Sequence, residues 1–266
     1  MEFQNIDAIE YLNSIQNNSI DLILTDPPYI ISRESGMNTH YNKVRENQNN
    51  NMKSEEEWET YKQNHNVGED KKELYLKYGT IYGKKYCVRT NYGDWDTTFT
   101  IEELEDIIKQ YYTKLKKGGT LIIFFDLWKI ETLKDILEKN KFKQIRMIEW
   151  IKTNPQPLNS KLNYLTNCRE IALTAVKGSK PTFNSSYDNG IYMYPLQSGK
   201  ERFHPTQKSI KLFEELIIKH TNVGDTVMDT FVGGGTTMYA CKHTNRKFKG
   251  CEKNHEYFNQ VYKSYC

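Results

Sequence analysis

Hydrophobic residues along this chain gather in short apolar runs that alternate with helical spacings. The apolar runs predict buried strands, because a strand covered on both faces needs no polar alternation. They span residues 20–25, 120–125, 145–150 and 170–176, and two later ones begin at 226 and 247. Helical spacing predicts helices over 101–115, 130–139 and about 210–220, with a last amphipathic helix near the C-terminus. Strands alternating with helices indicate an α/β fold with a doubly wound, mainly parallel sheet.

Two polar stretches interrupt this alternation. Residues 31–92 are rich in asparagine and charged side chains, and they predict a long insertion with short helices packed through Trp58 and Tyr61. Residues 178–203 combine proline, glycine, serine and asparagine with several aromatic side chains. The chain contains no internal repeat, and its 266 residues suit one large domain spanning 1–266, although length alone also allows two.

Composition and charge narrow the classes of protein that remain. The net charge of +3 permits nucleic acid as a partner without requiring it. The 5 cysteines form no Cys-x-x-Cys pair, and their odd number argues against a complete disulfide framework. No apolar run approaches the roughly 20 residues of a membrane span, and the polar start predicts no signal peptide. A cytoplasmic location is therefore expected, and the 6 scattered histidines predict no metal site.

The segment Asp26-Pro27-Pro28-Tyr29 directly follows the first buried strand. Proline has no backbone donor and disfavours helix in the residue before it, so the strand ends abruptly. An acid, a carbonyl and an aromatic ring then lie at the carboxyl end of a strand, where open α/β sheets bind ligands. The carboxylate and the Pro27 carbonyl can accept both protons of an exocyclic amine, and Tyr29 can stack on the flipped base that carries it. A plain Pro-Pro turn with a surface tyrosine is the alternative.

A second candidate for chemistry is the glycine turn within residues 226–237. This segment predicts a strand, a turn whose backbone can approach a ligand closely, and the start of a helix. The next strand ends in Glu252, and an acid at this place can bind ribose hydroxyls. A phosphate-binding loop needs a lysine beside the glycines, and a dinucleotide site needs a third glycine where Met238 stands. A nucleoside without a pyrophosphate remains, and S-adenosylmethionine fits, with a simple glycine-rich turn as the alternative.

Together these segments resemble the S-adenosylmethionine-dependent DNA amino-methyltransferases of the β class, whose motifs are circularly permuted. The catalytic motif comes first, and the cofactor motif comes near the C-terminal end. Further matches follow the family's order, at Gly93-Asp94-Trp95-Asp96, 115–120, 150–155, 169–173 and 204–208. The resemblance covers both ends of the chain and most of its middle, and it excludes roughly residues 31–92.

Three residues depart from the pattern that is usual in this family. Thr230 and Ser209 stand where proline is usual, and Gly234 stands where serine is usual. Thr230 and Gly234 are small changes inside a turn, and a serine such as Ser209 can cap or begin a helix. The implied cofactor is therefore unchanged.

The resemblance implies a seven-stranded Rossmann-like sheet and assigns roles to particular residues. The implied catalytic residues are Asp26, Pro27, Pro28 and Tyr29. The implied cofactor-binding residues are Asp7, Ala8, Asp26, Thr206, Lys208, Asp229, Phe231, Gly233, Gly235, Thr236, Thr237 and Glu252. Among these, Thr206 and Lys208 are expected to hold the cofactor carboxylate, and Asp7 is equally well explained as a surface acid at a helix start. Candidate DNA contacts are Lys152, Asn154, Lys161, Arg169, Lys200 and Arg202, although a solvated surface accounts for each of the lysines singly.

The implied activity is methyl transfer from S-adenosylmethionine to the amino group of a base flipped out of double-stranded DNA. Aspartate before Pro-Pro-Tyr and the segment Gly93 to Asp96 favour adenine N6, with cytosine N4 as the alternative. Residues 178–203 are the candidate target-recognition segment, and the 31–92 insertion competes for that role. A homodimer and a cognate restriction endonuclease are the further partners that the resemblance suggests.

Two other classes of function agree less well with these residues. An NAD-linked or nucleotide-sugar oxidoreductase would need the missing third glycine, and its motif would come earlier in the chain. A catalytically inactive DNA-binding relative would not need an intact Asp26 to Tyr29 segment or an intact glycine turn. Methyl transfer to DNA would distinguish an active enzyme from both.

Overall fold

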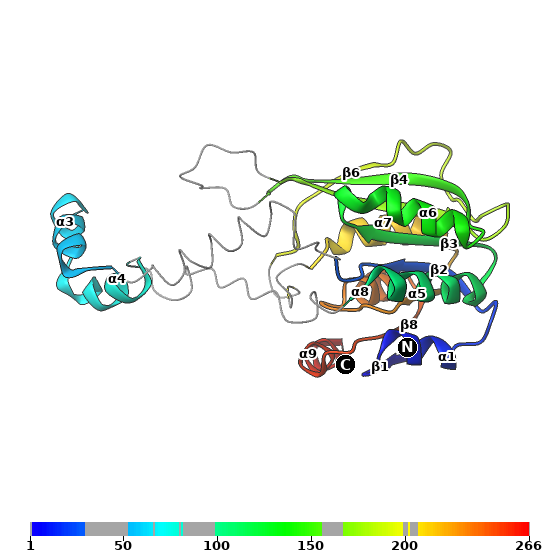
Figure 1. Cartoon of the computed structure of the whole chain (residues 1–266), viewed down its shortest axis with the longest axis horizontal. Helices are drawn as coiled ribbons and strands as arrows, with labels where there is room; N and C mark the ends of the chain where they lie inside the picture. The colour runs from blue at the N-terminus through cyan, green and yellow to red at the C-terminus, as the bar shows by residue number, and fades with distance from the viewer. Residues whose placement is uncertain are drawn as a thin grey trace. The chain divides into compact units, whose positions relative to one another are not determined.

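The computed structural model describes residues 2–29, 53–65, 67–79, 81, 99–155, 167–198, 202 and 207–265. The chain divides into two compact units, one made of Met1–Ile30 with Thr98–Cys266 and the other of Ile31–Thr97. The larger unit holds the sheet, and the described part of the smaller unit consists of short helices (Figure 1). No helix in the described ranges has the length and apolar character needed to cross a membrane.

The described strands of the larger unit form one eight-stranded sheet. They are β1 (Glu2–Gln4), β2 (Ile20–Thr25), β3 (Leu115–Phe125), β4 (Lys143–Lys152), β5 (Arg169–Val176), β6 (Ile191–Tyr194), β7 (Thr226–Asp229) and β8 (Lys247–Cys251). Their order is β1-β8-β7-β2-β3-β5-β4-β6. β5 runs antiparallel to β3 and β4, and the other described pairings are parallel. The sheet is mainly parallel, as expected, but it has eight strands instead of seven.

Helices cover both faces of this sheet (Figure 1). One face packs against α1 (Ala8–Ser14), α5 (Ile101–Lys114) and α6 (Ile130–Lys139), and the other against α7 (Ile210–His220), α8 (Thr236–His243) and α9 (His255–Tyr265). Alternate residues of β2 serve the two faces, since Leu22 and Leu24 join the core under α7 and α8 while Ile23 joins the core under α1 and α5. The continuous apolar run of β2 is thus explained by burial on both sides.

Local sequence explains where α5 begins and which face it buries. The Thr100 side chain accepts from the Glu103 amide, and the Glu103 side chain accepts from the Thr100 amide, which together form a capping box. Leu104, Ile107 and Tyr111 recur at helical spacing and are buried. The helix ends at Lys114, one residue earlier than expected, because Leu115 already pairs with Ile20 at the start of β3.

The central strand β2 lies between β3 and β7, which are far apart along the chain. Leu22 pairs with Val227 of β7 and with Thr120 of β3. The strand order therefore reverses at β2, and ligands bind at such a switch point, beyond the carboxyl ends of the strands. This pairing brings the end of β2 beside the end of β7, so the two motifs found in the sequence meet at one edge.

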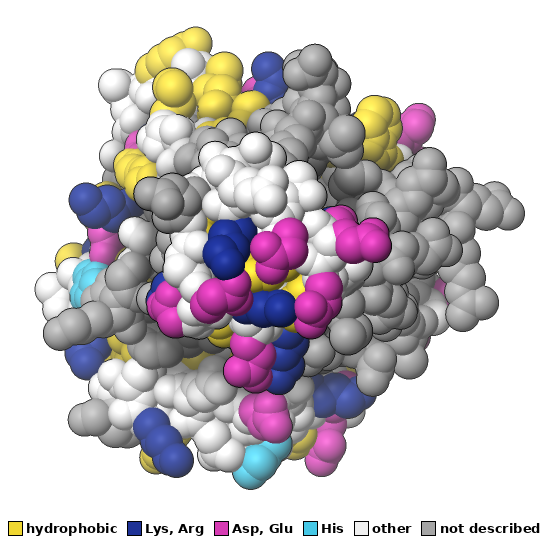
Figure 2. Space-filling view, turned by 90° about the vertical axis from the view of Figure 1, so that its left-hand side faces the viewer, with side chains coloured by type: hydrophobic (Ala, Val, Ile, Leu, Met, Phe, Trp, Pro, Cys, Tyr) yellow, Lys and Arg dark blue, Asp and Glu magenta, His cyan; other side chains and the backbone are white. Residues whose placement is uncertain are grey.

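The smaller unit contains α3 (Glu55–His65), a 3-10 turn η1 (Glu69–Lys71) and α4 (Lys72–Tyr78). Trp58 is fully buried, and its ring centroid lies 5.5 Å from that of Tyr75. Lys72 pairs with Glu55 at 3.0 Å across the two helices. Acidic and basic side chains are interspersed on the face drawn in Figure 2, which shows no continuous basic patch among its described residues.

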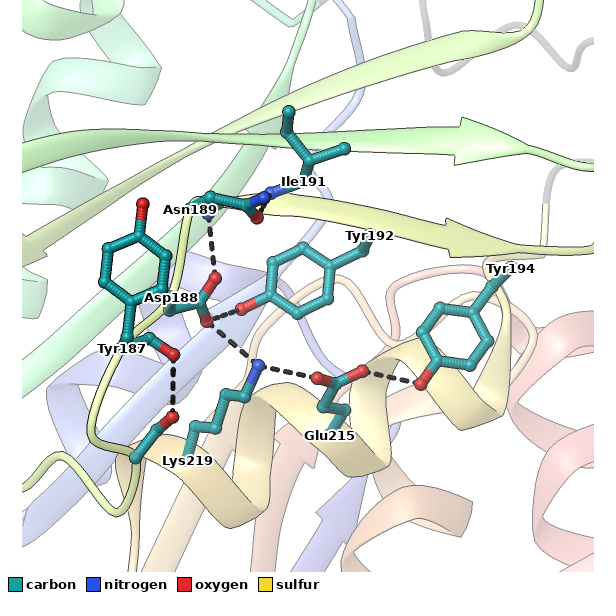
Figure 3. Close-up of polar contacts among 10 residues, drawn as sticks. Tyr187, Asp188, Asn189, Ile191, Tyr192, Tyr194, Glu215 and Lys219 are labelled. Atoms are coloured by element: carbon teal, nitrogen blue, oxygen red, sulfur yellow. Dashed lines mark hydrogen bonds and ion pairs between the residues drawn. The ribbon is translucent and has the colours of Figure 1, made fainter.

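A polar network fastens part of the 178–203 segment to α7 (Figure 3). The Asp188 carboxylate accepts hydrogen bonds from the Tyr192 hydroxyl and from Lys219 Nζ, the latter at 3.0 Å. Lys219 also pairs with Glu215 at 2.5 Å, and the Tyr194 hydroxyl donates to Glu215 at 2.5 Å. β6 lies within this segment, so the polar stretch that interrupts the predicted alternation holds a short strand that pairs with β4.

His220, the last residue of α7, is expected to make the protein less stable at mildly acidic pH. Its Nδ1 is buried without a hydrogen-bond partner in the described structure, and its ring lies 5.4 Å from that of Phe183. Burial lowers the pKa of His220 from 6.5 to about 4, although Asp188 opposes this shift. The neutral ring is therefore favoured in the folded state, and stability present above pH 6.5 falls as pH drops toward 4.

Between pH 7 and pH 5 this group alone should cost about 2 kcal/mol of unfolding free energy. Urea unfolding of the wild type and of His220→Phe at both pH values measures the effect, because the variant keeps a ring against Phe183 but cannot take up the proton. Carboxylates titrate in both proteins, so the result is the difference between the two proteins in how much the unfolding free energy changes from pH 7 to pH 5. An equal change in both would show that His220 does not control acid stability.

Candidate active site

Asp26 directly follows β2, and its two carboxylate oxygens have different surroundings. Oδ2 lies 2.5 Å from Lys208 Nζ. Oδ1 is buried and has no hydrogen-bond partner among the described residues. An unpartnered buried carboxylate oxygen is costly unless a ligand completes it. The geometry therefore leaves one acceptor of Asp26 available for a donor that enters from outside.

Tyr29 lies beside this carboxylate, at the end of the same turn. Its ring packs edge-on against Phe125 at 6.3 Å, and Lys208 Nζ lies 5.5 Å from its ring centroid. The Tyr29 hydroxyl donates to Glu170 Oε2 at 3.4 Å. Pro27 is buried and Pro28 is partly buried. The acid and the ring expected from the sequence are thus brought together at the edge of β2.

The glycine turn after β7 is tight, and its departures from the family pattern have structural reasons. Gly235 has a φ of +80°, and a Cβ there would come within 2.8 Å of a Val261 methyl, so glycine is required. A Cβ on Gly234 would come within 2.9 Å of the Gln207 side chain, which occupies the place of the usual serine side chain. The Thr230 hydroxyl, where proline is usual, hydrogen-bonds the buried Tyr111 hydroxyl.

Glu252 follows β8 and faces the same turn. Its Oε2 accepts from the Gly233 amide at 2.8 Å, and its Oε1 accepts from the Asn254 amide at 2.8 Å. Burial raises the pKa of Glu252, although these two amides favour its ionised form. A carboxylate has about four acceptor positions, so these amides leave acceptor capacity for ligand hydroxyls.

Asp229 joins the ends of β2 and β7. Its carboxylate accepts from the Thr25 hydroxyl at 2.7 Å, from the Thr237 hydroxyl at 2.6 Å and from the Phe231 amide at 3.0 Å. Burial raises the pKa of Asp229 to about 6, against the effect of these hydrogen bonds. Its side chain thus fixes the start of the glycine turn against the strand that carries Asp26.

The remaining cofactor candidates lie around these two strand ends. Asp7 caps α1 through the Ile9 amide at 2.9 Å, which agrees with the helix-start explanation, and Lys253 Nζ lies 3.0 Å from its other oxygen. The preceding loop also reaches the end of β8, because the Asn5 side chain donates to the Glu252 carbonyl at 2.7 Å. Ala8 is buried, and the Thr236 hydroxyl donates to the Lys208 carbonyl at 3.4 Å. Thr206 lies outside the described residues.

The candidate DNA contacts differ in their accessibility. The Lys152 side chain is only 14% exposed and pairs with Glu170, whereas Arg169 is 64% exposed beside Glu149. Asn154 accepts from the Leu196 amide at 2.6 Å, and Arg202 is exposed. Lys161 and Lys200 lie outside the described residues, as does the segment Gly93 to Asp96.

Glu170 is the functional candidate to which sequence reasoning gave no role. It lies at the start of β5 and pairs with both Lys208 and Lys152, each at 2.7 Å. The sequence placed it in a strand within a segment that matches the family. Its direction in the sheet was not readable, and only the antiparallel course of β5 brings it to the edge where Asp26 lies.

A doubly wound sheet with an acidic Pro-Pro turn and a glycine turn at its switch point defines a Rossmann-like transferase fold. Residues 20–263 match the model of the N6_N4_Mtase family, described as DNA methylase. The chain belongs to this family and is a DNA methyltransferase, which confirms the class of enzyme expected from the sequence.

Comparisons with individual proteins agree with this family membership. The type II methyltransferase M2.LlaDCHI of Lactococcus lactis subsp. cremoris is 28% identical over 94% of this chain and 84% of its own length. The crystal structure of the M1.HpyAVI–SAM complex is similar with a TM-score of 0.65 and 28% identity, covering 98% of this chain and 97% of that one. The PvuII DNA methyltransferase, which is cytosine-N4-specific, has a TM-score of 0.66 at 16% identity, covering 99% of this chain and 86% of that one, and shows a shared fold alone. These likenesses confirm the expected fold class.

Proposed function

We propose that this protein is a β-class DNA methyltransferase that transfers a methyl group from S-adenosylmethionine to adenine N6 in double-stranded DNA. The observation that carries the proposal is the Asp26 carboxylate, whose Oδ1 is buried and has no hydrogen-bond partner among the described residues. An acceptor of this kind suits the amino group of a base taken out of its stack. The order of the motifs, with Asp26 ahead of Gly233, supports the permuted class.

The residues at the ends of β7 and β8 fit the methyl donor. Glu252 has acceptor positions left for ribose hydroxyls, and the glycine turn at Gly233 to Gly235 has little side-chain bulk, with Gly233 partly exposed. In this proposal the adenosine and methionine parts are held by Asp7, Ala8, Thr206, Lys208, Asp229, Phe231, Gly233, Gly235, Thr236, Thr237 and Glu252. When bound, S-adenosylmethionine supplies a methyl group on a sulfonium, which is a good leaving group, so no covalent enzyme intermediate is needed.

The protein's own contribution is to orient the amine and to stabilise charge. Asp26 Oδ1 and the Pro27 carbonyl accept hydrogen bonds from the two amino N–H groups, which draws the nitrogen toward tetrahedral geometry and frees its lone pair. The nitrogen loses one of these protons once it carries the methyl group. As positive charge develops on that nitrogen, the Asp26 carboxylate stabilises it. Tyr29 stacks on the extruded ring and replaces part of the stacking lost from the duplex.

The choice of adenine rests on the sequence around Asp26. Both adenine and cytosine present an exocyclic amine to the same acceptors, and a cytosine-N4-specific enzyme shares the fold. Aspartate before Pro-Pro-Tyr favours adenine in the family resemblance, and cytosine N4 is the alternative product.

Product analysis tests the function directly. The purified protein is incubated with S-adenosylmethionine and unmethylated DNA, and the digested DNA is examined by mass spectrometry. We expect N6-methyladenine as the modified base, and Asp26→Ala under the same conditions is the negative control. N4-methylcytosine as the only product would replace the adenine assignment, and no modified base on any DNA would contradict the proposed activity.

Recognition and biological context complete the proposal. Asn154, Arg169 and Arg202, with Lys161, Lys200 and Lys152, are the candidate DNA contacts, and residues 178–203 form the candidate target-recognition segment. One relative is named a type II methyltransferase, and a role beside a restriction endonuclease in the cytoplasm is part of this proposal. The 31–92 insertion as a second recognition element and the homodimer stay predictions.

A further inference from the structure

A buried line of alternating charges leads from Asp26 into the protein. Lys208 Nζ lies 2.5 Å from Asp26 Oδ2 and 2.7 Å from Glu170 Oε2. Lys152 Nζ lies 2.7 Å from Glu170 Oε1. The side chains of Lys208, Lys152 and Glu170 are 6%, 14% and 17% exposed, and that of Asp26 is 24% exposed. Two carboxylates and two ammonium groups make the set neutral.

Four separate segments of the chain supply these side chains. Asp26 follows β2, Lys208 precedes α7, Glu170 starts β5 and Lys152 ends β4. Buried ion pairs add little net stability compared with apolar packing, because desolvation offsets their attraction. Stability alone therefore does not explain why a four-membered set is placed behind the one residue expected to touch the target amine.

We propose that Lys208 and Glu170 are positioning residues for the catalytic carboxylate: Lys208 holds Asp26 Oδ2, Glu170 shares Lys208, and Oδ1 is thereby left aimed at the adenine amino group. This inference rests on the proposed role of Asp26. Lys152 anchors Glu170 from the far side and so supports this arrangement.

The charge balance shows why a second carboxylate is useful. Burial raises the pKa of Asp26, Lys208 lowers it, and the like charge of Glu170 raises it again. Burial also raises the pKa of Glu170, but Lys208 and Lys152 together hold it below its usual range. If Lys208 paired with Asp26 alone, its positive charge would cancel the negative charge that must stabilise the amine. Because Lys208 also pairs with Glu170, it orients Asp26 while the Asp26 carboxylate stays a strong hydrogen-bond acceptor.

The other titratable groups that face Asp26 are few in the described structure. Tyr29 lies on the same turn, and burial raises the pKa of its hydroxyl well above the usual value. Asp229 lies at the end of β7, and its charge interacts with that of Asp26. Neither is changed in the variants below, so shifts in pH dependence report on Lys208 and Glu170.

The test is the pH dependence of the single-turnover rate of methyl transfer in Glu170→Gln and Lys208→Met. Glu170→Gln removes the like charge, so the acidic limb of the profile should move to lower pH while the plateau rate falls about tenfold. Lys208→Met removes the cation, so the limb should move to higher pH. A purely structural role would lower the rates without moving the limbs in opposite directions, and unmoved limbs would overturn the inference.

Calorimetry with S-adenosylmethionine separates this role from cofactor binding. Unchanged affinity is expected in Glu170→Gln, whereas Lys208→Met is expected to lose some affinity, because Lys208 is also a proposed cofactor residue. Lost affinity in Lys208→Met with an unmoved acidic limb would leave Lys208 with the cofactor carboxylate alone and overturn the inference. The control variant Glu105→Gln breaks a surface ion pair with Lys139 between α5 and α6. Its single-turnover rates, their pH dependence and its cofactor affinity should match those of the wild type.

Failure of the positioning role can be told apart from failure of the proposed function. If Lys208→Met does not fold, Glu170→Gln alone decides, because glutamine keeps the size of the side chain. If Asp26→Ala is inactive but Glu170→Gln behaves as the wild type, only the positioning role is wrong.

Discussion

Replacing Asp26 with alanine is expected to lower the single-turnover rate of methyl transfer by roughly 10²–10³-fold, the usual effect of removing one preorganised electrostatic group. The variant loses the acceptor at Oδ1 and the carboxylate that stabilises charge on the attacking nitrogen. Rapid-quench measurement with labelled S-adenosylmethionine and a saturating DNA duplex reports the chemical step without product release.

Two controls accompany this variant. Thermal unfolding checks the fold, because the change leaves Lys208 with Glu170 as its remaining carboxylate partner among the described residues. Affinity for S-adenosylmethionine should fall less than the rate, since Glu252 and the glycine turn are untouched. A wild-type rate in folded Asp26→Ala would exclude Asp26 as the amine acceptor.

Replacing Glu252 with alanine is expected to weaken binding of S-adenosylmethionine by roughly 10- to 100-fold, because each hydrogen bond to a charged group contributes about 1.5–3 kcal/mol. The carboxylate also holds the Gly233 amide at 2.8 Å, so its loss loosens the turn as well. Isothermal titration calorimetry in the absence of DNA measures this affinity directly.

Asn254→Ala is the matched control for the loop after β8. The Asn254 side chain accepts from the Glu256 amide at 2.9 Å and caps α9, so its removal disturbs the same loop without removing the carboxylate. Near-wild-type affinity is expected for this control. If Glu252→Ala binds as tightly as the wild type, the ribose contact lies elsewhere.

Local sequence was sufficient where a signal is confined to a few neighbouring residues. β2 spans Ile20–Thr25 and α6 spans Ile130–Lys139, the bounds expected from their apolar patterns. β6 was missed because its apolar run has only four residues, follows Asn189-Gly190 and precedes Pro195, so it was counted with the polar segment 178–203. β1 has three residues and no periodicity that can be read.

The lysines near the active site show where reasoning from residue type stops. Lys152 was predicted to contact a phosphate, and the family resemblance implied that Lys208 holds the cofactor carboxylate. In the fold both are largely buried and pair with Glu170. A lysine in a polar segment gives no sign of its partner, because the partner lies on another strand.

The sequence by itself determined the α/β class, the family, and the acid, ring and glycine turn of the site. Those signals are local, since proline ends a strand wherever it stands and glycine alone fits a crowded positive-φ turn. Only the tertiary structure decided that β5 runs antiparallel and carries Glu170 to the edge where Asp26 and Lys208 meet. Strand direction is set by long-range pairing and burial, and apolar periodicity is the same whichever way a strand runs.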